Sequence, residues 1–189
     1  MMKPFNGYEP KYQSASPTFE PLPEGAYVGK IYGAKADDQS LTLQVDVTEG
    51  EFAQYYRKRF EADKDSTYGQ KYKGTFRLSL PQGDGNDEWK IRAFNTAIGA
   101  IELSNPGYKF DWNEAGLKGK NVGLNVRERE WEFNGNTGVT TEIGALVAVE
   151  DVKAGKVKPM KRRALKGGSS ANTGNAGGFI EVNVEDIPF

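Results

Sequence analysis

The sequence predicts a mainly β domain that contains one long amphipathic helix and is followed by a flexible, charged tail. Five segments alternate between apolar and polar residues, as strands with one buried face do. A further segment, residues 91–101, instead repeats its apolar residues at the spacing of a helix. Residues 167–183 are rich in Gly, Asn and Ser, a composition typical of a disordered linker.

The first three predicted strands are residues 27–36, 41–47 and 72–80. A short polar turn joins the first two into a hairpin. Glycines inside the first strand, Gly29 and Gly33, are typical of the tight bends of a small closed barrel. One face of the third strand is cationic and suits contacts with a phosphate backbone, through Lys71, Lys73 and Arg77. An edge strand that uses lysine to prevent aggregation explains this row equally well.

Residues 51–63, between the second and third strands, change to helical spacing. The aromatic residues recur three or four positions apart, and cations cluster on the polar side. Two interpretations are open. The segment is either a short helix that packs its rings on the sheet, or a mobile loop that lays cations and a ring on a nucleic acid. The second interpretation assigns nucleic-acid contacts to Tyr55, Arg57, Lys58 and Arg59.

The long helix is predicted to begin at an N-cap on Asn86 or Asp87 and to end by residues 105–107. Residues 82–88 before it look like a calcium-binding loop, but the Asp-x-Asx-x-Asx-Gly spacing is missing. A hairpin follows the helix, so the element order is β-β-β-α-β-β. That order is the order of the OB fold, a five-stranded barrel with a helix between strands 3 and 4.

The hairpin spans residues 120–149 and has one apolar face and one basic, aromatic face. Val122, Leu124 and Val126 point to the core in its first arm, and Ile143, Val147 and Val149 do so in the return arm, which we expect to begin at Val139. The opposite face of the first arm carries Asn125, Arg127, Arg129, Trp131 and Phe133. Rings that stack under unpaired bases and guanidiniums that meet phosphates are what a single-stranded nucleic-acid platform requires. An ordinary exposed strand, with Arg–Glu pairs and Trp131 covering a core edge, is the alternative.

Composition excludes several classes of function. The chain has no cysteine and no histidine, which removes disulfides, Cys- or His-liganded metal sites and imidazole catalysis. Catalysis would have to rest on carboxylates, Lys or Tyr, and we expect no cofactor, no metal and no catalytic residue. The net charge is only −1, but residues 153–166 carry +7, residues 167–189 carry −3 and residues 1–152 carry −5. A cationic segment between acidic neighbours favours a polyanionic partner.

The C-terminal residues form an acidic and apolar peptide, and we expect it to dock on another protein. The sequence Val184-Glu-Asp-Ile-Pro-Phe189 resembles the C-terminal tip of bacterial single-stranded DNA-binding proteins, which follows a Gly-rich linker in that family. Residues 19–27, Phe94-Asn95 and 117–122 resemble a phage family of OB-fold single-stranded DNA-binding proteins. The resemblance implies that the tip recruits replication or recombination enzymes through Glu185, Asp186, Ile187, Pro188 and Phe189.

Residues and resemblance together predict a protein, not an enzyme, that coats and protects single-stranded DNA without strong sequence preference. A recombination mediator or strand-annealing accessory protein would share this fold and DNA site. A metal-dependent nuclease would have to use carboxylates such as Asp84, Asp87 and Glu88. A purely structural β-protein would not distinguish single-stranded from double-stranded DNA.

The predicted organisation is an extended N-terminal arm, a DNA-binding domain, a basic segment, a flexible linker and a partner-binding tip: residues 1–20, 21–152, 153–166, 167–183 and 184–189. The sequence shows no signal segment and no apolar run of membrane-spanning length. We therefore expect a cytoplasmic protein without a membrane partner, in the host cytoplasm if it is phage-encoded. Homo-oligomers are compatible with the sequence.

Overall fold

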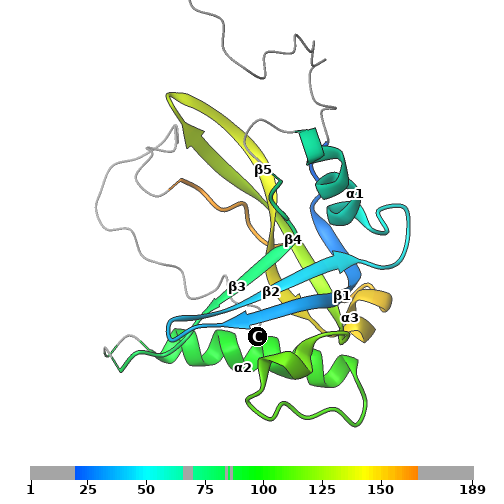
Figure 1. Cartoon of the computed structure of the whole chain (residues 1–189), viewed down its shortest axis with the longest axis vertical. Coiled ribbons are helices and arrows are strands. Elements are labelled where there is room, and N and C mark those ends of the chain that lie inside the picture. The colour runs from blue at the N-terminus through cyan, green and yellow to red at the C-terminus, as the bar shows by residue number, and fades with distance from the viewer. Residues whose placement is uncertain (1–19, 66–69, 84, 86, 166–189) are drawn as a thin grey trace, which may run out of the picture.

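Five antiparallel strands form one sheet in the order β3-β2-β1-β4-β5, with helix α2 between β3 and β4 in sequence (Figure 1). The computed structural model describes residues 20–65, 70–83, 85 and 87–165. The strands are β1 (Gly25–Ala36), β2 (Ser40–Val47), β3 (Thr75–Ser79), β4 (Asn121–Phe133) and β5 (Asn136–Val147). The helices are α1 (Tyr55–Ala62), η1 (Asp63–Asp65), α2 (Glu88–Ser104), η2 (Glu114–Leu117) and α3 (Val149–Lys153). The mainly β class and the position of the long helix are as predicted.

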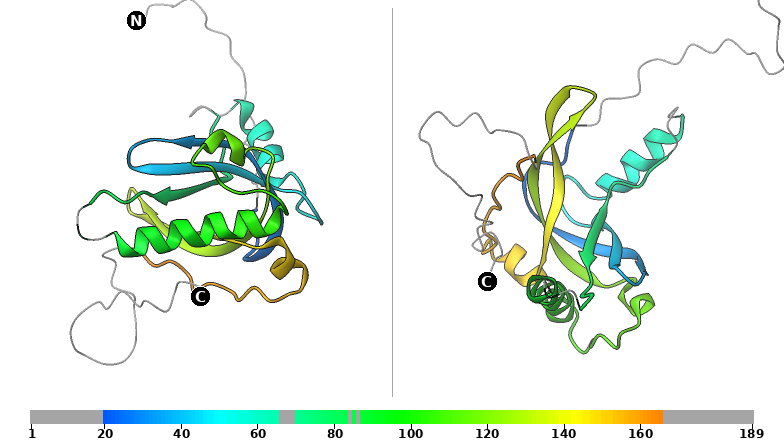
Figure 2. Two further views of the ribbon diagram at one scale, coloured as in Figure 1. Left: turned by 90° about the horizontal axis from the view of Figure 1, so that it is seen from below. Right: turned by 90° about the vertical axis from the view of Figure 1, so that its left-hand side faces the viewer.

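The sheet is strongly curved but does not close into a barrel. Figure 2 shows the β4–β5 hairpin projecting on one side of the sheet and α1 on the other. The edge strands β3 and β5 approach each other, yet among the described residues no hydrogen-bonded ladder joins them. The closed five-stranded barrel that the sequence predicts is therefore not shown.

The core lies between the concave face of the sheet and α2. Ile31, Leu43 and Leu124 from three strands are fully buried there, together with Ile101 of α2. Apolar side chains at these positions account for the alternation and the helical spacing in the sequence. The helical stripe is shorter than predicted, because Ile91 in the first turn of α2 is exposed.

The segment between β2 and β3 forms a short helix that packs its rings on the sheet. Neighbouring rings meet edge to face, with centroids 5.8 Å apart for Tyr27 and Phe52 and 5.1 Å apart for Tyr55 and Tyr56. Both rings of the second pair are buried, and the Tyr55 hydroxyl donates to the Glu20 carbonyl at 2.6 Å. The prediction that Tyr55 stacks on a nucleic acid is wrong, because its ring belongs to the core.

Helix α1 is anchored by a buried carboxylate from β2. Its N-cap residue Gln54 has a positive φ of 61° and makes no side-chain cap. The Asp46 carboxylate accepts instead from the Tyr56 amide at 3.0 Å and the Arg57 amide at 2.9 Å. Gly74 makes room for this packing, since a Cβ there would lie 2.7 Å from Cγ of Tyr56. Asp46 thus performs from a neighbouring strand what a cap residue normally does.

A β-bulge in β5 changes which side chains of the hairpin face the core. The β4–β5 register shifts between Asn125 and Val126, which leaves Gly144 as the extra residue. Leu146 is consequently buried and Val147 only partly so, whereas the unbroken alternation predicted Val147 in the core. Val149 was also predicted in the core, but it begins α3 and is partly exposed.

Two sequence predictions about the ends of the chain lie outside the described residues. These are the extended arm before Glu20 and the linker with its acidic tip, residues 167–189. Within the described ranges, no helix is both long and apolar enough to cross a membrane.

Replacing Asp46 by Ala should lower the free energy of unfolding by about 1–3 kcal/mol, because the amide groups of α1 and of Val47 lose their buried acceptor. Urea unfolding measures this change. Asp38→Ala, at an exposed position in the β1–β2 turn, is the matched control and should leave the midpoint nearly unchanged. Equal midpoints for the two variants would show that Asp46 does not anchor α1.

Candidate nucleic-acid interface

Four of the predicted site residues lie side by side on the outer face of the β4–β5 hairpin. Their alternate positions along β4 place them on one face: Arg127, Arg129, Trp131 and Phe133. The residues opposite them on β5 are Glu142, Thr140, Gly138 and Asn136. Two cations and two aromatic rings therefore form a continuous row that runs toward the hairpin turn.

The indole of Trp131 lies across the strand on Gly138. A Cβ at position 138 would lie 2.8 Å from the indole atoms Cε2 and Cζ2, so only glycine leaves room for this placement. Trp131 is still 37% exposed, and Phe133 is 69% exposed. A two-residue turn with φ of 50° at Asn134 and 76° at Gly135 keeps these rings at the end of the hairpin. The row thus ends in one ring that is held on the strand and one that is largely free.

The arginines of the row converge on a single carboxylate. Nε and Nη2 of Arg127 both lie 3.1 Å from Oε1 of Glu142, and Nε of Arg129 lies 3.6 Å from Oε2. A third guanidinium, that of Arg163, approaches Glu142 at 3.4 Å. Cross-strand Arg–Glu pairing, which was the structural alternative for this face, is therefore present. Three cations around one anion nevertheless leave a net charge of +2.

The basic segment after α3 packs on this hairpin through residues 158–165, which we call the strap. Strand β1 pairs with β4 only as far as Val126, so the edge of β4 beyond Val126 has no partner in β1. There Arg163 donates its amide to the Glu128 carbonyl and accepts from the Glu130 amide, both at 2.9 Å. The strap thus adds one parallel bridge to the sheet and belongs to the domain rather than to the tail.

The strap also covers part of the outer face that was predicted to be open. Asn125 is buried, and its Nδ2 donates to the Lys158 carbonyl at 3.1 Å. A Cβ at Gly144 would lie 2.7 Å from the sulfur of Met160, which shows how closely the strap approaches β5. Asn125 therefore fixes the strap and does not belong to an exposed surface.

The cationic row predicted on the third strand is a second, separate group. Lys71, Lys73 and Arg77 are all exposed, but only Arg77 lies within β3. Arg77 pairs with Thr42, which pairs in turn with Lys35, so the two cations share the outer face of three adjacent strands. Tyr32, at the bulge in β1, adds a half-exposed ring to this part of the sheet. Neither Lys35 nor Tyr32 was predicted; Tyr32 lies at the bulge, which has no periodic pattern, whereas Lys35 is in the regular part of the ladder.

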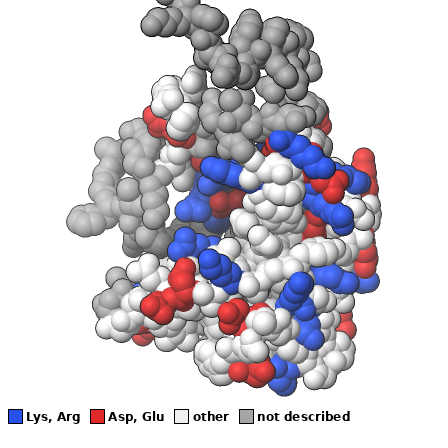
Figure 3. All heavy atoms as spheres, viewed as in Figure 1, with Lys and Arg blue, Asp and Glu red and all other residues white. Residues whose placement is uncertain are grey.

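The cations of α1 form a third group. Arg57 and Lys58 are exposed, while Arg59 is partly buried; Arg57 pairs with Glu61 at 3.1 Å. In Figure 3 Lys and Arg side chains gather over α1 and, separately, along the region where β3 and the hairpin meet. The nucleic-acid contacts of Arg57, Lys58 and Arg59 stay a prediction, now without the ring of Tyr55.

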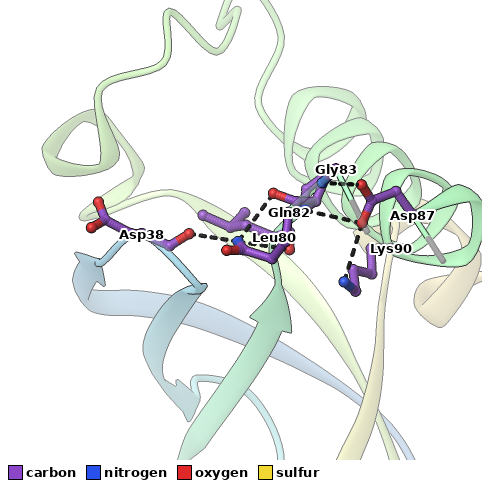
Figure 4. A network of polar contacts seen from close by, with 7 residues as sticks. Asp38, Leu80, Gln82, Gly83, Asp87 and Lys90 are labelled. Carbon is purple, nitrogen blue, oxygen red and sulfur yellow. Dashed lines mark hydrogen bonds and ion pairs between the residues drawn. The ribbon is translucent and has the colours of Figure 1, made fainter. Parts of the chain in front are cut away.

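Of the carboxylates suggested for a metal site, Asp87 has a structural role and Glu88 is exposed. Asp87 accepts from the amides of Gln82 at 3.0 Å and Gly83 at 2.6 Å and pairs with Lys90 (Figure 4). These bonds to the preceding turn hold the pKa of Asp87 below its usual range. Helix α2 begins after Asp87, as predicted, but the carboxylate makes no N-terminal cap. Asp84 lies outside the described residues, and among those described no group of three acidic residues could hold a metal ion.

An exposed aromatic cluster near α2 was not predicted. Trp112 is 81% exposed, and its ring is stacked on Phe94 with centroids 5.9 Å apart. Figure 1 shows α2 at the end of the molecule opposite the hairpin tip. Trp112 does not belong to the row of Arg127, Arg129, Trp131 and Phe133, so it provides a control for the ring of the hairpin.

Replacing Gly138 by Ala should move the indole of Trp131 off the strand, because the new methyl group would occupy the space of the ring. We expect a large shift of the Trp131 indole N–H resonance, with little change for Trp89 and Trp112. Gly135→Ala, in the turn, would test hairpin distortion separately. An unshifted Trp131 resonance in the Gly138 variant would contradict the placement of the indole.

No protein-family model matches this chain, and no curated protein is significantly similar to it. The resemblance to single-stranded DNA-binding proteins therefore rests on the sequence motifs alone. The arrangement of rings and guanidiniums on the hairpin is the independent evidence on which a function can be argued.

Proposed function

We propose that this protein binds single-stranded DNA through the outer face of the β4–β5 hairpin, without strong sequence preference. The observation that carries the proposal is the indole of Trp131 held on Gly138, with the exposed ring of Phe133 and a surplus of guanidinium groups in the same row. Exposed rings offer stacking surfaces to unpaired bases of any sequence. Guanidiniums at alternate positions of the same strand offer contacts to the phosphates between those bases.

The rings favour a single strand over a duplex as the ligand. Bases in a duplex already stack on each other and turn only their edges to the grooves, so an exposed ring has no base face to contact. Each base stacked on an aromatic side chain contributes about 1–3 kcal/mol. Cations alone would bind both forms, because phosphate contacts carry no sequence or strand information.

The architecture supports the same proposal. A sheet in the order β3-β2-β1-β4-β5 with a helix between β3 and β4 has the strand order of an OB fold. Proteins of that fold bind oligonucleotides on the face of strands 2 and 3 and at the loops between strands 1 and 2 and between strands 4 and 5. Lys35, Arg77 and the tip of the β4–β5 hairpin lie at corresponding places.

The C-terminal tip completes the proposal. We infer from its resemblance to bacterial single-stranded DNA-binding proteins that it recruits a replication or recombination enzyme. Its acidic residues, together with Ile187 and Phe189, suit a basic-rimmed apolar pocket on a partner protein. DNA binding and recruitment are then separate properties of two parts of the chain.

Trp131→Ala should weaken binding to poly-dT by about 5- to 150-fold, which corresponds to the loss of one stacked base. Fluorescence anisotropy of a labelled oligonucleotide, with a duplex of the same length beside it, measures this change.

Trp112→Ala is the matched control, since it removes an equally large exposed ring from the opposite end of the molecule. It should leave the affinity unchanged. Equal affinity of the wild type for single strand and duplex would contradict the proposal, and so would cleavage of the oligonucleotide when Mg²⁺ is added.

Deleting residues 186–189 should abolish capture of a partner enzyme while the affinity for poly-dT at physiological salt stays the same. Pull-down of purified replication and recombination enzymes measures the first effect and anisotropy the second. Replacing Phe189 alone by Ala should have nearly the effect of the deletion. Capture that survives the deletion would disprove the role of the tip.

A further inference from the structure

One carboxylate cannot satisfy the three guanidiniums that surround Glu142. An ionised carboxylate offers about four acceptor positions, whereas three guanidiniums carry about fifteen N–H donors. Arg127 uses two of its nitrogens on Oε1, while Arg129 and Arg163 make longer contacts of 3.6 Å and 3.4 Å. Most donors of the last two residues are therefore available to a second anion.

We propose that Arg163 of the strap, together with Arg129 and Arg127, forms a phosphate-binding site within the hairpin surface. This inference rests on the proposed function and adds a residue from a segment that the domain boundaries predicted from the sequence exclude. Glu142 is then an internal anion that holds the guanidiniums together before DNA arrives. The phosphate of a bound strand supplies the remaining acceptors.

The exposure of the four side chains fits these roles. Arg127 and Glu142 are each 20% exposed, so their pair is the fixed base of the cluster. Arg129 and Arg163 are 45% and 48% exposed and face solvent. A phosphate can thus reach the outer two guanidiniums without breaking the Arg127–Glu142 pair.

The neighbouring Arg162 points to the other side of β4. Arg163 is bridged to Arg129, and bridged residues share a face, so the side chain of Arg162 is on the opposite face. There its Nε donates to Glu128 at 2.6 Å, and Glu130 is 4.0 Å away. Arg162 is accordingly neutralised by two carboxylates, while the cluster of Arg163 keeps a positive charge.

The cluster is next to the stacking residue along the same strand. Arg129 and Trp131 are two residues apart on one face of β4, a separation of about 7 Å. A strand whose base stacks on Trp131 therefore brings its phosphates to the cluster without a turn. Arg163, bridged to Arg129, extends the site across the strand direction.

The test compares Arg163→Gln with Arg162→Gln in the full-length protein. Poly-dT affinity is measured for both variants at several salt concentrations. We expect Arg163→Gln to weaken binding about tenfold at low salt. The salt slope, which is the steepness with which log K falls against log salt concentration, should decrease by about 0.7, the contribution of one phosphate contact on a single strand. Arg162→Gln should change neither quantity, although it removes the same charge from the adjacent position.

Three outcomes would decide the matter. Equal weakening by both variants would contradict the proposed phosphate site, because binding would then depend on the total positive charge of the strap and not on the position of Arg163. Wild-type binding by Arg163→Gln, while Trp131→Ala weakens binding, would overturn the inference and leave the proposed function intact. If wild-type protein binds no single strand, the proposed function itself fails.

The Arg163→Lys variant distinguishes the effect of the positive charge at position 163 from the effect of the planar guanidinium group. The strap bonds to β4 through its backbone, so all these variants should keep the strap in place and unfold at the wild-type temperature. Lysine keeps the charge but not the planar fork, so we expect the wild-type salt slope with a several-fold weaker affinity. A salt slope as low as that of Arg163→Gln would contradict a phosphate contact at this residue.

Discussion

The length of β4 relative to its partner β1 determines most of the surface described above. Strand β1 begins at Gly25, opposite Val126, whereas β4 continues to Phe133. The outer half of β4 therefore has unpaired backbone groups on one side, which is a costly condition in a partly covered strand. The strap satisfies two of them through Arg163. The same difference in length lets the hairpin project beyond the core, so that its rings remain exposed.

A second constraint acts at the other side of the sheet. Helix α1 has no cap of its own, and the buried carboxylate of Asp46 fixes its first turn on β2. That attachment places the aromatic side of α1 on the sheet and its cations in solvent. Two of the three basic groups described above thus differ in construction. One is a helix surface positioned by a single carboxylate, and the other is a strand surface positioned by backbone pairing.

Local patterns predicted the strands, the long helix and the row of Arg127, Arg129, Trp131 and Phe133, because alternation and helical spacing report directly on which face is buried. Local patterns failed where contacts between residues distant in sequence determine which side chains are buried. The bulge at Gly144 buries Leu146 in place of Val147, and the strap buries Asn125. The helical spacing of residues 51–63 indicated a helix but not which ring lies deepest, and Tyr55 is in the core. The place of Arg163 depends on a bridge to a residue 34 positions earlier, for which the sequence has no local pattern.

The contact between Trp131 and Gly138 has a consequence for the thermodynamics of binding. An indole that already lies on the strand has given up its rotamer freedom during folding, so a ligand does not have to order it. Preorganisation of this kind lowers the entropic cost of association and leaves more of the stacking energy as net affinity. Phe133 is much more exposed, so its ring still has to lose rotamer freedom when a ligand binds. Two adjacent rings of similar chemistry can therefore contribute unequally, for reasons that lie in the free protein rather than in the complex.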